Sequence, residues 1–196
     1  MLPPMWQINQ YPHALQALIS ETQKSGFNMA SEPKTGTLLM ALSASKPKGR
    51  MLELGTGTGI STAWLLQGMD QHASLLSVDN DPHCQQIAQK HFANDPRVTF
   101  VCQDGDEFLA AAQNQKFDLI FADAWPGKFS SLELAINLVA EGGLYIIDDL
   151  LPQDNWPEGH APRIPKLIQT LESNPAFRSL KMEWASGLMV LVRHMG

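Results

Sequence analysis

Cysteine is scarce in this sequence, which argues against both a disulfide framework and a cysteine-based metal site. Only Cys84 and Cys102 occur among the 196 residues, and their separation does not match a metal-binding spacing. We expect the first in a helix and the second at the end of a strand. A reducing compartment is therefore expected, and we predict a cytoplasmic protein.

Runs of basic residues and long apolar runs are also missing. The formal net charge is -6, with 14 basic and 20 acidic residues, which disfavours a nucleic-acid partner because phosphate backbones are bound by clustered Lys and Arg. No window approaches the roughly 18 apolar residues of a membrane span. Residues 1–16 contain three prolines and no basic segment before an apolar core, so we expect neither a secretory signal nor a membrane partner.

The length and the hydrophobic content of 44% predict one domain over residues 1–196. Short apolar runs alternate with helical patterns from residue 50 onward, which is typical of a parallel sheet covered on both faces. Before them lies a helical N-terminal part, 1–46, and after them an irregular loop at 150–163, a helix near 164–173 and a closing β-hairpin at 177–194. The predicted strands are 50–54, 73–79, 97–104, 116–123 and 142–149. Asp81-Pro82 is expected to begin a helix after the second strand, with Asp81 as its N-cap, and we expect the helix before the last strand to end at Gly142-Gly143.

The sequence LELGTGTGIS (52–61) places three glycines between a predicted strand and a predicted helix. Such a turn exposes backbone N–H groups at a helix N-terminus and can hold a nucleotide-like ligand. A dinucleotide-binding turn requires glycine at the sixth position, where this chain has Ile60. The carboxylate of Glu53 would repel a pyrophosphate and would suit a cationic group. The turn therefore favours S-adenosylmethionine over NAD.

Acidic residues follow the predicted strands at their carboxyl ends, the edge where ligands bind in open α/β sheets. Asp79 lies 20 residues after Gly59 and can accept hydrogen bonds from both hydroxyls of a ribose, and Asp104 can accept one from an adenine amine. Each alone could be a helix cap or a solvated strand end. Their occurrence around one glycine turn favours a binding site.

A second acidic group consists of Asp123, Asp148 and Asp149, at the ends of the fourth and fifth predicted strands. Three carboxylates on adjacent strand ends form a set of hard oxygen ligands suited to Mg²⁺, Mn²⁺ or Ca²⁺. Such a cation or a positioned base would help to deprotonate a hydroxyl acceptor for methyl transfer. We therefore predict divalent-metal assistance at these three residues.

The motifs LELGTGTGIST, SVDNDP, CQDGDEF, FADAWPGKF and YIIDDLLP together resemble the class I S-adenosylmethionine-dependent methyltransferases. More narrowly, the chain is similar to the small-molecule O-methyltransferases that include the catechol and caffeoyl-CoA enzymes. The resemblance covers roughly residues 27 to 195. It implies a Rossmann-like fold with a seven-stranded, mostly parallel sheet whose last strand is antiparallel, and helices on both faces. It also implies a homodimer, with the helical N-terminal part as the candidate interface.

Carried over to matching positions, the resemblance implies a set of cofactor-binding residues. They are Met29, Ser31, Glu53, Gly55, Thr56, Gly57, Ser61, Asp79, Asn80, Asp104, Gly105, Asp123 and Trp125. The metal ligands of the family are Asp, Asp and Asn, and here Asp149 stands in place of the Asn. That exchange adds negative charge and keeps the oxygen-ligand capacity.

The chain departs from the resemblance at the catalytic lysine, which related enzymes carry three residues after the first metal-ligating Asp. Pro126 occupies that position, and Lys128 follows two residues later. Lys128 either reaches the same space through the Pro-Gly turn, as a catalytic residue with Asp123, or lies exposed at a helix start. His160 in the loop is a further candidate base, although a lone loop histidine is more often solvated.

Three tryptophans can each be assigned either to the wall of a binding pocket or to a packing position. Trp125 is expected to wall a flat acceptor, Trp156 is equally consistent with a pocket and a core position, and Trp184 is expected to pack in the hairpin.

The leading hypothesis is metal-assisted methyl transfer to a hydroxyl of a small molecule. The alternatives are a metal-independent N- or carboxyl-methyltransferase, a cofactor-binding protein without transfer activity, and an NAD-dependent oxidoreductase.

Overall fold

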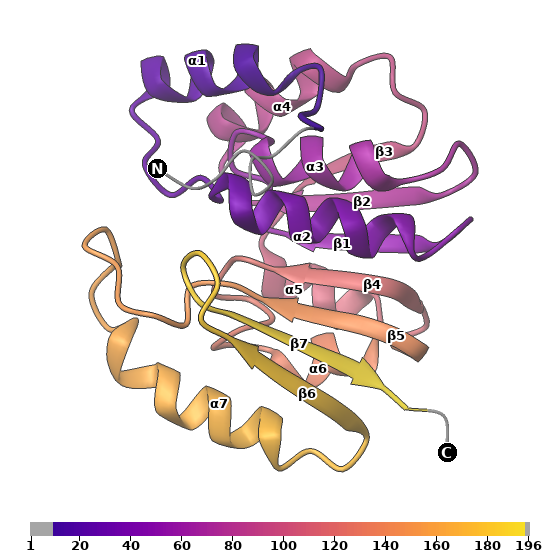
Figure 1. Ribbon diagram of the computed structural model, residues 1–196, viewed down its shortest axis with the longest axis vertical. Helices are drawn as coiled ribbons and strands as arrows, with labels where there is room; N and C mark the ends of the chain where they lie inside the picture. The colour runs from indigo at the N-terminus through magenta and orange to yellow at the C-terminus, as the bar shows by residue number, and fades with distance from the viewer. Residues whose placement is uncertain (1–9, 195–196) are drawn as a thin grey trace.

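A single seven-stranded sheet runs through the computed structural model, which describes residues 10–194. Its strand order is β3-β2-β1-β4-β5-β7-β6, and β7 alone runs antiparallel to its neighbours (Figure 1). The strands are β1 (Arg50–Leu54), β2 (Ser74–Asp79), β3 (Val98–Cys102), β4 (Phe117–Ala122), β5 (Val139–Ile147), β6 (Phe177–Met182) and β7 (Leu188–Arg193). The predicted fold class is therefore confirmed.

Helices cover both faces of the sheet. One face carries α1 (Leu15–Ser25), α2 (Pro33–Ala44), α3 (Ile60–Gly68) and α4 (Pro82–Phe92), and the other carries α5 (Gly105–Ala111), α6 (Leu132–Asn137) and α7 (Ile164–Glu172). A short 3₁₀ helix, η2 (Ala161–Arg163), precedes α7. The first nine residues of the predicted helical N-terminal part lie outside the described residues, and so does most of the segment in which no secretory signal is expected.

The strands are apolar because both of their faces are buried. In β1, Leu52 and Leu54 pack into the core beneath α5, α6 and α7, whereas Met51 packs into the core beneath α1, α2 and α3. Successive side chains of a strand point to opposite faces, so one strand contributes to both cores. This arrangement produces the continuous apolar runs of a parallel sheet.

The start of α4 follows the expected capping pattern. The Asp81 side chain accepts hydrogen bonds from the backbone N–H groups of His83 and Cys84, and Pro82 occupies the first turn. Proline is tolerated there because the first N–H groups of a helix have no intrahelical partner. The end of β2 and the beginning of α4 are thereby held in one defined geometry.

Two local expectations differ from the structure. The helix α6 ends at Asn137, and Gly142-Gly143 lies inside β5, where the pairing with β4 shifts register. Gly142 has a φ of 69°, and a left-handed residue within a strand is typical of a bulge. The sequence reasoning also missed α5, although Asp104 caps it and two acidic residues occupy its first turn, a recognisable helix start.

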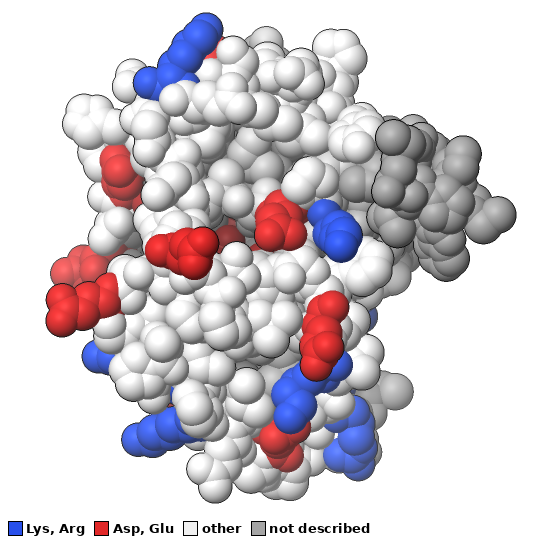
Figure 2. Space-filling view, turned by 60° about the vertical axis from the view of Figure 1, so that its left-hand side comes forward, with Lys and Arg blue, Asp and Glu red and all other residues white. Residues whose placement is uncertain are grey.

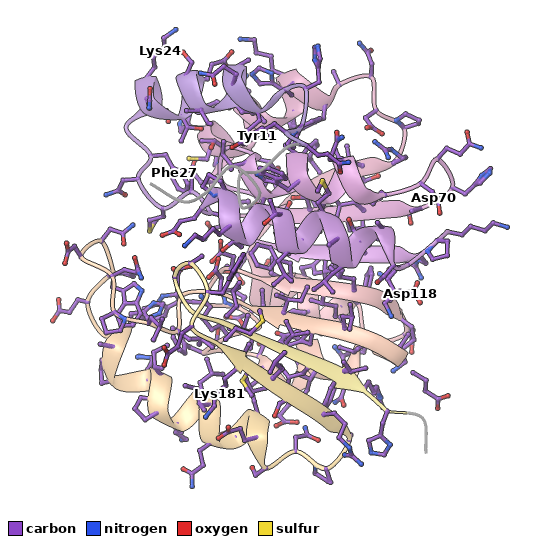
Figure 3. The ribbon with its side chains drawn as sticks, viewed as in Figure 1. Tyr11, Lys24, Phe27, Asp70, Asp118 and Lys181 are labelled. Atoms are coloured by element: carbon purple, nitrogen blue, oxygen red, sulfur yellow. The ribbon has the colours of Figure 1, made fainter. Side chains whose placement is uncertain are left out.

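The carboxyl ends of the parallel strands meet at one edge of the sheet. Figure 3 shows Phe27 at that edge, and Asp70 and Asp118 at the opposite edge, where β2 and β4 begin. The connections leave β1 and β4 in opposite directions along the sheet, and a crevice forms where the strand order reverses in this way. Among the described residues, no helix combines the length and the apolar character needed to cross a membrane.

Candidate active site

A cavity of about 370 Å³ opens at the carboxyl ends of β1, β2 and β4. Its walls come from the glycine turn after β1, the start of α3, the end of β2, the segment after β4, the loop before α2 and the loop before α7. The residues predicted for the cofactor that line it are Met29, Ser31, Gly55, Thr56, Gly57, Ser61, Asp79, Asn80, Asp123 and Trp125. The fold thus brings most of the predicted set together around one space.

The glycine turn presents bare backbone to this space at Gly55 and Gly57. Gly55 has a φ of 102°, and a Cβ there would lie 2.7 Å from the backbone oxygen of Asp123. At Gly57, with a φ of 50°, a Cβ would approach the Phe27 ring to 3.0 Å. Only glycine adopts these conformations without strain. A ligand can therefore come close to the backbone N–H groups at the start of α3.

Asp79 is fixed by the turn that it faces. Its Oδ2 accepts a hydrogen bond from the Gly57 N–H at 2.7 Å, and its Oδ1 accepts one from the Asp81 N–H at 2.8 Å. Carboxylate oxygens have further acceptor capacity. The side chain is therefore oriented toward the cavity and can still accept hydrogen bonds from a ligand hydroxyl.

Glu53 lies beneath the cavity and does not line it, contrary to the expected direct contact with the cofactor. Its side chain is fully buried, and its Oε2 accepts hydrogen bonds from the hydroxyls of Thr62 at 2.6 Å and Ser77 at 2.5 Å. Its Oε1 has no hydrogen-bond partner among residues 10–194. Burial raises the pKa of Glu53 to about 7, against the opposing effect of these hydroxyls. Glu53 supports the strands below the glycine turn.

Asp104 and Gly105 also lie outside the residues that line the cavity. The Asp104 side chain accepts hydrogen bonds from the N–H groups of Asp106 and Glu107, as the cap of α5. This is the helix-cap alternative that the sequence left open. The reason is local, because an Asp immediately before a helix satisfies backbone donors of the first turn.

Several cavity residues were not identified from the sequence. Among them are Phe27, Thr58, Asp81 and Pro157. Thr58 belongs to the glycine motif, and Asp81 had been recognised only as a helix cap. Phe27 and Pro157 lie in loops, where no periodicity indicates which way a side chain points.

Lys128 is buried among acidic side chains at the end of this cavity. Its side chain is 2% exposed, and its Nζ lies 3.8 Å from Asp123 Oδ1 and 3.8 Å from Asp149 Oδ2. The alternative of an exposed residue at a helix start is therefore wrong. Lys128 thus points inward beside Asp123, two positions after the place in the sequence where the resemblance puts the catalytic lysine.

The turn after β4 explains this position. Gly127 has a φ of 84°, and the N–H groups of Lys128, Phe129 and Ser130 all donate to the backbone oxygen of Trp125. The Tyr145 hydroxyl donates to the Gly127 oxygen from beneath. The chain therefore folds back tightly and directs Lys128 inward.

The acidic side chains around Lys128 influence one another's pKa values. Burial and the negative charges of Asp148 and Asp149 raise the pKa of Asp123 well above its ordinary value, while Lys128 opposes this shift. Burial and the charge of Asp149 raise the pKa of Asp148 to about 6. Close like charges in a poorly solvated space favour the protonated form of a carboxyl group. A raised pKa makes the Asp123 carboxylate a stronger base than an ordinary one.

An aromatic group closes the acceptor side of the site. His160 is 3% exposed, stacks on the Trp156 ring at 4.4 Å between centroids and packs edge-on against Phe129. Its Nε2 lies 3.1 Å from the backbone oxygen of Asp149, and burial lowers its pKa. His160 is thus a packed residue beside the site, not a solvated loop histidine.

The other two tryptophans differ in position. Trp125 lines the cavity and carries the Arg163 guanidinium over its ring at 4.7 Å. Trp184 is 44% exposed and donates a hydrogen bond to the backbone oxygen of Lys34. It therefore packs at the surface of the hairpin and not in its core.

A smaller cavity of about 80 Å³ adjoins the first. It shares Met29, Ser31, Asp123 and Asp149 with the larger cavity. Its further walls include Glu32, Asp148, Gln153, Asn155, Trp156 and Ser186. The two spaces therefore meet at the acidic group around Lys128.

The sequence model of a family described as "Methyltransferase domain" matches residues 52–150, which include the glycine turn, Asp79, Asp123 and Lys128. The chain belongs to this methyltransferase family. The matched region extends from β1 to just beyond β5 and so contains most of the strands that bound the larger cavity.

Curated relatives of this methyltransferase include mycobacterial proteins that carry provisional O-methyltransferase names. One from Mycolicibacterium vanbaalenii is 26% identical over 150 residues, which are 71% of this chain and 66% of the relative. One from Mycobacterium leprae is 31% identical over 101 residues, 50% of this chain and 45% of the relative. The alignments thus span less than two thirds of the relatives' own length.

Solved structures of methyltransferases share the fold over almost the whole chain. An O-methyltransferase from Bacillus cereus in complex with SAH has a TM-score of 0.79 at 21% identity, covering 95% of this chain and 93% of the other. The O-methyltransferase TomG from Streptomyces achromogenes in complex with SAM has a TM-score of 0.79 at 16% identity, covering 95% and 92%. At these identities the likeness shows the fold.

Proposed function

We propose that this methyltransferase transfers the methyl group of S-adenosylmethionine to a hydroxyl oxygen of a small molecule. The observation that carries the proposal is the continuity between the glycine turn with Asp79 and the buried group of Asp123 and Lys128. A donor site and a site for proton transfer thus share one cavity. The O-methyltransferase names of the relatives support the same reaction.

The donor half of the cavity fits S-adenosylmethionine. The bare backbone at Gly55 and Gly57 leaves room that a Cβ would fill, and Asp79 is oriented to accept hydrogen bonds from ribose hydroxyls. When bound there, S-adenosylmethionine supplies a methyl group on a positively charged sulfur. The residues of the cavity then align this group with the acceptor and exclude water.

The acceptor half of the cavity, which contains Asp123 and Lys128, takes up the proton that the reaction releases. The new bond joins the acceptor oxygen to the methyl carbon, the bond from that carbon to sulfur breaks, and the hydroxyl proton passes to the Asp123 carboxylate. Asp123 suits this role because its pKa is raised by its surroundings. Loop 150–163, through Trp156 and Pro157, forms the wall against which the acceptor lies.

The predicted divalent cation does not fit the residues as they are arranged. Within the described part of the chain, no three His, Cys, Asp or Glu side chains come together in a way that would hold a metal ion. The Lys128 ammonium faces both Asp123 and Asp149. We therefore include no metal ion in the reaction.

Radiolabelled methyl transfer tests the proposal. The protein is incubated with S-[methyl-³H]adenosylmethionine and a panel of catechols, hydroxycinnamates and flavonoids, and the methylated atom is identified by mass spectrometry. We expect an oxygen-methylated product, and we expect Asp79→Ala to reduce its formation. A product methylated on nitrogen or carboxylate would contradict the proposal, as would binding of S-adenosylhomocysteine without any turnover. Tighter binding of NAD than of S-adenosylhomocysteine would point to an oxidoreductase.

A further inference from the structure

The Lys128 ammonium lies beside the acidic residues that were predicted to bind a divalent cation. Its Nζ is equally distant from Asp123 Oδ1 and Asp149 Oδ2, at 3.8 Å each, and its side chain is almost completely buried. A positive charge on a buried side chain is stable only beside compensating negative charge. Lys128 is thus the counter-charge that the chain itself provides for these carboxylates.

The carboxylates are also partly occupied by protein donors. Ser31 donates to Asp123 Oδ2 at 3.2 Å. The Ser186 hydroxyl donates to Asp148 Oδ1, which also accepts from the Asp149 N–H at 2.7 Å. Divalent cations such as Mg²⁺ require about six oxygen ligands in regular geometry. Two of the three carboxylates therefore each have one oxygen engaged by protein donors, while Lys128 supplies the positive charge beside Asp123 and Asp149.

Resting on the function proposed above, we propose that the Lys128 ammonium takes the place of the divalent cation predicted from the sequence. In the reaction, it faces the acceptor oxygen and compensates the negative charge that develops when the hydroxyl proton leaves for Asp123. A fixed positive charge in a space that excludes water stabilises such an oxygen strongly. Methyl transfer by this chain then needs no metal.

The same geometry restricts the acceptor. Lys128 Nζ lies 3.8 Å from Asp123 Oδ1 and from Asp149 Oδ2, which is an electrostatic contact beyond hydrogen-bond distance. An ammonium is a single point charge that does not chelate, whereas a divalent cation can bind two neighbouring hydroxyls at once. We therefore expect an acceptor with a single hydroxyl to be methylated as efficiently as the corresponding catechol.

Measurement of Mn²⁺ binding by electron paramagnetic resonance tests whether Lys128 replaces the divalent cation. This experiment needs no methyl acceptor. Lys128→Met removes the charge and keeps much of the length, and Lys166→Met, at an exposed position of α7, serves as the matched control. We expect the unaltered protein and the Lys166→Met protein to leave millimolar Mn²⁺ free, and Lys128→Met to acquire a binding site. Stoichiometric Mn²⁺ binding by the unaltered protein, or no gain of binding in a folded Lys128→Met protein, would overturn the proposal.

Transfer assays give the second readout. Activity of the unaltered protein should survive exhaustive chelation with EDTA, and Lys128→Met should lower kcat by about 10²-fold or more, as removal of one charge-stabilising donor does elsewhere. Lys128→Arg should restore part of kcat because it keeps the charge. Loss of activity on chelation, with recovery on addition of Mg²⁺, would refute the replacement. Absence of transfer to any acceptor would instead count against the proposed function, while the Mn²⁺ measurement would still decide the role of Lys128.

Discussion

Asp79 and Asp104 follow neighbouring strands but act differently in this protein. The Asp79 carboxylate borders the cavity and is held by the Gly57 N–H, whereas the Asp104 carboxylate is used by the first turn of α5. Both residues fit the same sequence pattern of an acid at a strand end. What separates them is the partner that each carboxylate finds locally.

A pair of substitutions tests this distinction. Asp104→Ala should lower the free energy of unfolding by about 1 kcal/mol, the usual cost of losing a helix cap, and leave the affinity for S-adenosylhomocysteine unchanged. Asp79→Ala should weaken that affinity about tenfold or more, since hydrogen bonds to a charged acceptor are worth about 1.5–3 kcal/mol. Calorimetric titration and urea denaturation measure the two quantities. Equal losses of affinity in both proteins would show that Asp104 also contacts the cofactor.

Glu53 should make the stability of the ligand-free protein depend on pH. Its pKa is about 7 in the folded chain, against an ordinary value of 4.5, so the folded state binds more protons than the unfolded state between these values. The free energy of unfolding should therefore fall as pH rises through this range, by at most about 3 kcal/mol at 1.4 kcal/mol per pH unit. Above pH 7 this contribution should no longer change.

Comparison of Glu53→Gln with the unaltered protein isolates this effect. The amide cannot ionise, so urea denaturation between pH 5 and 8 should show a shallower decline for the Glu53→Gln protein. Glu141→Gln, at an exposed position of β5, should follow the unaltered protein. Parallel curves for Glu53→Gln and the unaltered protein would mean that Glu53 ionises at its ordinary pKa.

At the level of elements, the turn after β4 decides where Lys128 lies. Gly127 combines a φ of 84° with close neighbours, because a Cβ there would lie 2.6 Å from Leu54 Cδ1 and 3.0 Å from the Tyr145 hydroxyl oxygen. Gly26, at the end of α1, has a similar φ of 77°, but a Cβ would meet no atom of the described residues within 4 Å. Comparison of substitutions at the two glycines therefore distinguishes the effect of backbone strain from the effect of steric conflict.

Substitution of each glycine by alanine should reveal that difference. Gly26→Ala should destabilise the protein by about 1 kcal/mol, the cost of a left-handed conformation, and leave methyl transfer unchanged. Gly127→Ala should cost more than twice as much and should also reduce transfer, because the turn that directs Lys128 inward must shift. Chemical denaturation and the transfer assay provide the measurements. Equal stability losses would indicate that the turn adapts without moving its neighbours.

Loop 150–163 is irregular in sequence but is attached to the domain at several points. The Asn155 side chain donates to the backbone oxygen of Asn28 at 2.8 Å, and the N–H groups of Leu150 and Leu151 donate to the β6–β7 turn at Gly187 and Ser186. These contacts join three segments that are distant in the sequence. They hold the loop against the smaller cavity.

At the level of the whole molecule, the order of the strands in the sheet brings the residues of the site together. Strands β1, β2 and β4 end at one edge, and β6, which runs in the same direction, brings the β6–β7 turn to that edge, beside Asp148 (Figure 1). Figure 2, which turns the left-hand side of that view forward, shows acidic side chains across the middle of the face, with basic side chains beside and below them.

Much of this arrangement could be predicted from local patterns. Alternation of apolar strands with helices, the glycine turn and the strand-end acids depend on residues close together in the sequence, and their physical causes are local sterics, burial and capping. These patterns determined the fold class, the position of the donor half and the assignment of Asp79 and Asp123 to one edge. They also predicted the cap of α4.

Only the tertiary structure decided which acids face the cavity and what lies between them. Glu53 is withdrawn beneath the glycine turn because Thr62 and Ser77 bind it there, and Lys128 turns inward because Tyr145, from another strand, holds the Gly127 oxygen. Such contacts join residues from separate elements, and no spacing rule contains them. The sequence by itself determined which residues of the glycine turn and strand ends meet around one cavity, and long-range packing decided that Lys128 lies beside two of the acids predicted as metal ligands.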